Sequence, residues 1–237
     1  MIGTVANALA ILVFGIVGLR SNWSPAARYQ GYLKIGLAAL TAFIGLATAL
    51  TSLHGSWSQI FKGIVIGLLA LILGNLLGKL LGLQRSLNRL GKMARERLAS
   101  PAGTSRIKDG LVTATIAFCG SPMALLGALL EGLGVGSRLL LTKSALDGLA
   151  TLAFVRKFGG SPMLGIVPLV ALQGLVSLGA ARVEPFLRDH ALDDSVTFVA
   201  GFLVSFLSLV ILDIKKVPTA DYLPSLVLAP LLAWVWR

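Results

Sequence analysis

Charged side chains are scarce in this chain of 237 residues. Asp, Glu, Lys and Arg make up only 13% of it and hydrophobic residues 56%, whereas charged residues make up roughly 25% of an ordinary soluble domain. Apolar runs follow one another with little sequence between them. The composition therefore excludes a soluble globular protein and predicts one integral membrane domain over residues 1–237.

Cysteine and histidine are almost missing. Cys119 is the only cysteine, which excludes an intramolecular disulfide and a multi-cysteine metal site. His54 and His190 fall in separate expected loops, so they offer neither a metal-ligand spacing nor a Ser/His pair within the bilayer. No second mid-membrane Asp is available for an aspartyl pair, and no phosphate-cradling loop is present. We expect no enzymatic activity, no metal and no cofactor.

Long apolar runs are what the chain does have. A helix of about 17 to 25 apolar residues crosses the hydrocarbon core, and eight runs qualify, of which the sixth and eighth are short. The expected fold class is an all-α polytopic transmembrane bundle of seven or eight spans. No Lys or Arg precedes the first run, so we expect it to stay rather than be cleaved as a signal peptide. The candidate spans are 2–19, 33–52, 61–82, 110–130, 138–156, 162–180, 195–213 and 221–236.

The basic residues predict the orientation. Fifteen of the 21 Lys and Arg residues lie in the odd-numbered loops, so the positive-inside rule places both termini on the non-cytoplasmic side. The net charge of +11 gathers at membrane edges, where anionic lipid headgroups are expected partners and nucleic acid is not. The loop 83–108 should include a basic amphipathic helix at the cytoplasmic surface, or a continuation of the third span. We interpret it as an anchor rather than a regulatory element.

The tetrapeptide Gly-Ser-Pro-Met occurs twice, at 120–123 and 160–163. The first copy falls in the middle of the fourth span and the second in a turn that opens the sixth, so we interpret them as convergent bends rather than a duplication. Ser121 and Pro122 should bend or break the fourth helix. Two interpretations stay open: a proline kink that improves packing, or a discontinuous helix that forms a binding site.

The polar residues whose placement in the bilayer costs the most free energy lie in the fifth span. Asp147 is nine residues from both Arg138 and Arg156, which places it roughly 13 Å from either edge and near the bilayer centre. Lys143 lies one turn earlier on the same face, beside Ser144. The functional hypothesis is that Asp147 binds a cation, a proton or an amine, with Lys143 as counter-charge or anion contact. The structural alternative is a buried ion pair that fixes helix register.

Weaker candidates surround this pair. Asn7, Asn75 and Gln173 are amides in the first, third and sixth spans, and each could bridge helices or bind a ligand. A small-residue stripe in the third span predicts close helix packing, within a protomer or between protomers of a homo-oligomer. It consists of Gly74, Gly78 and Gly82. We interpret Glu131, at the outer end of the fourth span, as interfacial.

Four stretches resemble the YdfK/YqgA-like family of bacterial membrane proteins, a domain of unknown function. They are "FCGSPMALLGALLEGLGVGSRLLLTKSALDGLA" from residue 118, "MIGTVANALAILVFGIVGL" at the start, "LQG" at 172–174 and the late "IKKVPTADYLPSLVLAPLL". Ser121, Ser205, Ser208 and Asp213 depart from the residues expected of that family. The resemblance implies a bacterial inner-membrane protein loosely associated with transport, and supplies no substrate. Carried over by position, it falls on Cys119, Pro122, Met123, Lys143, Ser144, Asp147, Gly148, Gln173 and Gly174.

Three functional hypotheses follow from these residues. The first is a secondary transporter or exporter of a small polar or charged solute, with Lys143 and Asp147 at the midplane and the broken fourth helix completing the site. The second is a passive channel lined by the same residues, and the third is a membrane scaffold or sensor. Spans 1–3 and 4–6 run in opposite directions and could form an inverted repeat, as in many transporters.

Overall fold

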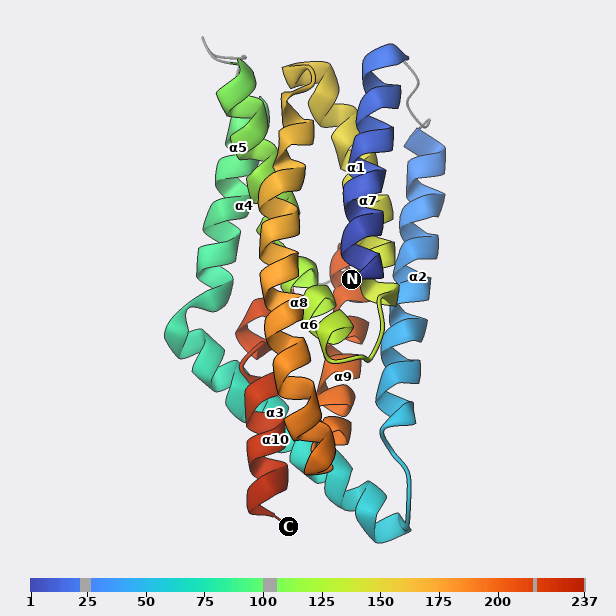
Figure 1. Cartoon of the computed structure of the whole chain (residues 1–237), viewed down its shortest axis with the longest axis vertical. Coiled ribbons are helices and arrows are strands. Elements are labelled where there is room, and N and C mark those ends of the chain that lie inside the picture. The colour runs from blue at the N-terminus through green and yellow to red at the C-terminus, as the bar shows by residue number, and fades with distance from the viewer. Residues whose placement is uncertain (22–26, 100–105, 215–216, 237) are drawn as a thin grey trace.

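The structure, a computed structural model, describes the chain except for residues 22–26, 100–105, 215–216 and 237 (Figure 1). Its described part consists of helices and their connections, with no strand, which confirms an all-α bundle. The α-helices are α1 (Ile2–Arg20), α2 (Ala27–Thr51), α3 (Trp57–Leu81), α4 (Leu83–Ala99), α5 (Arg106–Cys119), α6 (Pro122–Gly132), α7 (Arg138–Phe158), α8 (Ile166–Asp189), α9 (Asp193–Ile211) and α10 (Ser225–Val235). Two short 3-10 helices, η1 (Ser161–Gly165) and η2 (Thr219–Tyr222), precede α8 and α10.

Within the described residues, five helical segments are long and apolar enough to cross a membrane, and the bent pair of α5 and α6 gives a sixth. The long segments include α1, α3 and α9, most of α2, and η1 joined to α8. The protein is therefore a multi-pass membrane protein. Two of the eight expected crossings do not have a helix that is long and apolar enough, for different reasons.

The fifth and eighth expected spans are the two exceptions. The fifth is present as the 21-residue helix α7, but Lys143, Asp147 and the terminal arginines interrupt its apolar sequence. The eighth is reduced to α10, which has 11 residues. The sixth was predicted too short, because the helix continues past 180 through Arg182 and Pro185 to Asp189. Pro168 lies in the first turn of α8, where a missing N–H breaks no helical bond.

Among the residues that the structure describes, the buried apolar side chains form two clusters. The larger joins α6, α9 and α10 to the facing sides of α2 and α3, and includes Met123 and Leu139. The smaller joins α1, α5, α7 and α8 through Ile11, Phe118 and Phe154. Figure 1 shows α1 in the upper half of the molecule and α10 in the lower half, with the long α8 beside both. The helices α5–α6 and α7 cross from one cluster to the other.

Glycines allow the closest helix contacts. A methyl group at Gly74 would lie 2.5 Å from the Ser225 nitrogen, and one at Gly78 would lie 2.0 Å from the Asp221 carbonyl oxygen. These two glycines therefore pack α3 against η2 and α10 of the same chain. Gly82 has a different role from the one the stripe suggested: it has φ +66° and ends α3, with open space around it.

The basic helix appears where the sequence placed it, but it lies against the bundle. It follows α3 after a single residue and runs along α5. Its Arg97 forms an ion pair with Asp109 at 3.1 Å, while Arg85 and Arg89 are exposed. Residues 100–105 of the expected loop, and Lys215 and Lys216 of the charge count, lie outside the described residues.

Candidate binding site at the helix break

The fourth predicted span is broken where the sequence indicated. Helix α5 ends at Cys119 and α6 begins at Pro122, with a bend of 57° between them. Ser121 is the N-cap of α6, and its hydroxyl accepts a hydrogen bond from the Ala124 N–H at 3.2 Å. Pro122 occupies the first helical position, where its lack of an N–H does no harm. Cap and proline together define a new helix start rather than a mild kink.

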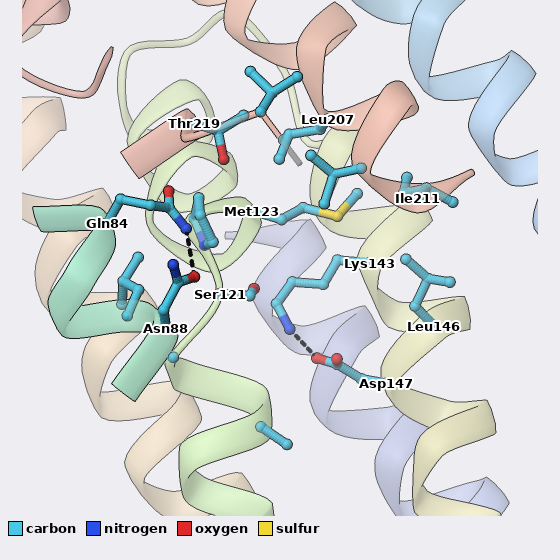
Figure 2. Close-up of a pocket in the computed structure, with 16 residues that line it drawn as sticks. Gln84, Asn88, Ser121, Met123, Lys143, Leu146, Asp147, Leu207, Ile211 and Thr219 are labelled. Atoms are coloured by element: carbon cyan, nitrogen blue, oxygen red, sulfur yellow. Dashed lines mark hydrogen bonds and ion pairs between the residues drawn. The ribbon is translucent and has the colours of Figure 1, made fainter. Parts of the chain in front are cut away.

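This break opens into a cavity of about 340 Å³. Ligand pockets are typically about 300 to 1,000 Å³, so the volume suits a small solute. Lys143 and Asp147 of α7 form part of the wall, together with Gly120, Ser121 and Pro122 (Figure 2). The remaining wall is mostly apolar and comes from α4, α5, α6, α7, α9 and the segment before α10. These lining residues are Gln84, Leu87, Asn88, Ala117, Met123, Leu146, Leu207, Val210, Ile211, Val217 and Thr219.

Lys143 and Asp147 form a buried ion pair on one face of α7. Lys143 is 2% exposed and Asp147 8%, and the Lys143 Nζ donates to Asp147 Oδ2. The Asn7 amide, fully buried on α1, donates to the same oxygen at 3.0 Å. The four-residue spacing brings the pair together, as expected for a helix. Asn7 can reach Asp147 because Gly3 and Gly18 let α1 lie directly against α7.

Three polar residues of the cavity wall were missed by sequence reasoning. Gln84 and Asn88 lie on α4 and Thr219 on η2, all in segments that the sequence assigns to loops. Gln84 is fixed at both ends: its side chain accepts from the Ala220 N–H at 3.0 Å and donates to Asn88 at 2.9 Å. Asp221 accepts from the Gln84 N–H at 2.8 Å, at the positive end of α4. No local sequence signal predicts the contacts of Gln84 with Ala220 and Asp221, which join residues more than a hundred positions apart.

Asn7 contacts Asp147 but does not itself line the cavity, and three further predicted site residues lie away from the cavity wall. The Ser144 hydroxyl donates to the Leu141 carbonyl of its own helix at 2.7 Å. Asn75 and Gln173 do not line the cavity either. Gln173 is 0% exposed, and neither of its side-chain polar atoms has a hydrogen-bond partner. The structure therefore brings Lys143, Asp147, Ser121, Pro122 and Asn7 together, and leaves these three outside.

Glu131 has a structural position that the sequence did not suggest. Its carboxylate accepts from the Gly3 N–H at 2.6 Å and from the Thr4 hydroxyl at 3.2 Å. A carboxylate at this place satisfies free N–H groups at the start of α1 and matches the positive end of the helix dipole. Glu131 is thus a cap that holds α1 beside α6 and α7, rather than a solvated interfacial residue.

The chemistry available at the site is that of charge and hydrogen bonding. The cavity presents an ammonium, a carboxylate, two hydroxyls and two amides. Cys119 is half-buried and does not line it. Within the described part of the chain, no group of three His, Cys, Asp or Glu side chains is arranged to hold a metal ion. This set can bind and release a polar molecule.

Comparisons with known proteins agree with the resemblance found in the sequence. A family model described as "Protein of unknown function (DUF554)" matches residues 2–234. The "Uncharacterized membrane protein YdfK" of Bacillus subtilis (strain 168) is 28% identical over 235 residues, which cover 99% of this chain and 96% of that protein. The "Uncharacterized protein YqgA" of Escherichia coli (strain K12) is 28% identical over 238 residues, which cover 100% and 97%. No solved structure matches the chain. The chain belongs to the DUF554 family.

Proposed function

We propose that this protein is a secondary transporter of a small polar or charged solute. The observation that carries the proposal is the Lys143–Asp147 ion pair in the wall of a cavity at a helix break. A pair that only fixed helix register would need no cavity beside it. Discontinuous helices next to intramembrane charges form substrate sites in many transporters.

The contacts around the cavity allow one of its walls, helix α4, to move. The cavity lies between the two apolar clusters, and α4 covers one side of it through Gln84 and Asn88. Helix α4 is attached to the bundle by a few polar contacts, including Gln84 with Asp221 and Arg97 with Asp109. The Arg97–Asp109 ion pair is largely exposed, and an exposed ion pair can be exchanged for water at little free energy. Movement of α4 about Gly82 would therefore open the cavity on that side.

The location and orientation of the protein are part of the proposal. We place it in the bacterial cytoplasmic membrane with both termini outside, because fifteen of the 21 Lys and Arg residues lie in the odd-numbered loops between the expected spans. In this orientation α4 and η2 belong to cytoplasmic segments, so the cavity faces the cytoplasm. The exposed Arg85, Arg89 and Lys92 of α4 would meet anionic headgroups. Homo-oligomerisation stays a prediction.

The test is solute uptake into proteoliposomes that contain the purified protein. Vesicles are incubated with an isotopically labelled bacterial metabolite extract, and the accumulated compounds are identified by mass spectrometry. Wild type should accumulate at least one small polar compound, and Asp147→Asn should lose that accumulation. Asp194→Asn is the matched control, because it makes the same change at a carboxylate that lies outside the cavity. Asp194 pairs instead with His54, at 3.2 Å.

The same vesicles separate the transporter from its alternatives. A transporter accelerates labelled uptake when unlabelled solute is loaded on the opposite side, whereas a channel shows no such trans-stimulation. A scaffold or sensor accumulates nothing in either wild type or Asp147→Asn. Uptake that is equal in wild type and Asp147→Asn would contradict the role of the ion pair.

A further inference from the structure

The cavity has unused hydrogen-bonding positions on both a positively and a negatively charged side chain. Both hydrogen bonds to the Asp147 carboxylate reach Oδ2, and no described residue donates to Oδ1. The Lys143 ammonium has three N–H donors and uses one of them on Asp147. The site therefore presents an unused carboxylate oxygen next to unused ammonium donors.

The helix break also places a partial positive and a partial negative charge beside the cavity, because one helix begins and another ends there. The positive end of α6 begins at Ser121, and the negative end of α5 finishes at Cys119, with Gly120 and Ser121 both at the cavity wall. A second and independent feature is the Thr219 hydroxyl. Thr219 is 4% exposed and lines the cavity, and its side chain makes no hydrogen bond to the described residues. Figure 2 shows its oxygen directed toward the space among Gln84, Ser121 and Met123.

Charge neutrality decides which solute fits. The empty site is neutral, because one ammonium is paired with one carboxylate. A single anion or cation would leave a net charge in a low-dielectric interior, which is strongly unfavourable. A zwitterion can insert its carboxylate beside Lys143 and its ammonium beside Asp147 and leave the loaded site neutral. Most of the other lining side chains, such as Leu146, Leu207 and Ile211, are apolar.

We propose that the solute is a small zwitterion with an apolar body, of the apolar α-amino acid class. This inference rests on the proposed function for its transport consequence, and on the cavity alone for its binding consequence. The carboxylate of the solute lies between Lys143 and the Ser121 cap of α6, with the Thr219 hydroxyl as a further donor. Its ammonium lies at Asp147 Oδ1, and its side chain contacts the apolar wall.

Three probes with one carbon skeleton test the charge requirement by calorimetric titration of the purified protein in detergent. Leucine carries both charges, 4-methylpentanoate lacks the amine, and 3-methylbutylamine lacks the carboxylate. Leucine should bind at least about tenfold more tightly than either single-charge probe. This ratio of Kd values corresponds to a difference of ~1.4 kcal/mol in binding free energy. Equal or tighter binding of 4-methylpentanoate or 3-methylbutylamine overturns the proposal. Absence of binding by alanine, leucine and phenylalanine at millimolar concentration overturns it as well.

Variants locate the binding. Lys143→Met and Asp147→Asn should each abolish leucine binding, and Asp194→Asn should leave it unchanged. If either single variant fails to fold, the double variant Lys143→Met with Asp147→Leu replaces it, because that variant buries no unpaired charge. Retention of leucine binding by a folded double variant overturns the proposal.

Failure of this inference and failure of the proposed function give different results. Accumulation of labelled solutes that are not zwitterions, with no leucine binding, overturns the zwitterion proposal and leaves the transporter standing. Leucine binding without accumulation of any solute supports the site and contradicts transport.

Discussion

Asn7 and Asp147 lie 140 positions apart in the chain, and the Asn7 amide donates to the Asp147 carboxylate at 3.0 Å. This contact joins α1 to α7 next to Lys143, so one buried oxygen holds two donors from two helices. The first helix is therefore part of the ion-pair site, and not only a membrane anchor.

Asn7→Leu should destabilise the protein by about 1.5 to 3 kcal/mol, because it removes a buried hydrogen bond to a charged group. Asn75→Leu is the matched control on α3. Both amides have a buried Oδ1 without a partner, but only the Asn7 side chain donates to a carboxylate, so an apolar side chain at Asn75 should be neutral or stabilising. Unfolding in detergent, followed by tryptophan fluorescence, measures both. A loss of stability with Asn75→Leu that equals the loss with Asn7→Leu would show that the Asp147 contact is not the cause.

The ion pair should show strong coupling in a double-mutant cycle. Lys143→Met or Asp147→Leu alone leaves an uncompensated buried charge and should cost about 3 to 5 kcal/mol. The double variant removes both charges and should recover most of that loss. The same unfolding experiment provides the four free energies of the cycle. Additive losses would mean that the two side chains do not interact in the folded protein.

Gly78→Ala should destabilise by about 1 to 3 kcal/mol, as overpacking does in a tight interface. The added methyl group would meet the Asp221 backbone at 2.0 Å, and Asp221 in turn holds the start of α4 through Gln84. Gly91→Ala is the control on α4, where nothing lies within 4 Å. There we expect a gain of about 0.5 to 1 kcal/mol from the better helix former. A stabilising Gly78→Ala would contradict the close contact between α3 and η2.

Cysteine labelling should show the side to which the cavity opens. In a Cys119→Ala background, Thr219→Cys places a thiol at the cavity wall without loss of a hydrogen bond. A membrane-impermeant thiol reagent should modify it from the cytoplasmic side in inverted vesicles. Ser58→Cys, exposed at the start of α3, should react from the other side. Reaction of both thiols from one side would contradict the orientation.

The sequence predicted the features that depend on local spacing. The break at Gly120 to Pro122 follows from a glycine, a capping serine and a proline in a row. The Lys143–Asp147 pair follows from a separation of one helical turn. Membrane insertion follows from composition. For the break and the ion pair, the residues that act lie within a few positions of one another.

The features that the sequence did not predict are long-range contacts. The Asn7 contact, the Glu131 cap on α1 and the attachment of Gln84 to Asp221 join residues more than a hundred positions apart. A single sequence carries no periodicity for such pairs. The length of α8 was underestimated for a related reason. Arg182 and Glu184 indicate a membrane edge, but a helix can extend beyond the bilayer with its backbone bonds intact.

We propose that Lys143 and Asp147 bind a solute that the protein transports. The most direct test of this proposal compares wild type with the double variant Lys143→Met with Asp147→Leu for uptake of the labelled metabolite extract into proteoliposomes. We expect the double variant to fold, as shown by its unfolding transition, and to accumulate none of the compounds that wild type takes up. Accumulation of the same compounds at the same rate by both proteins would contradict the proposal.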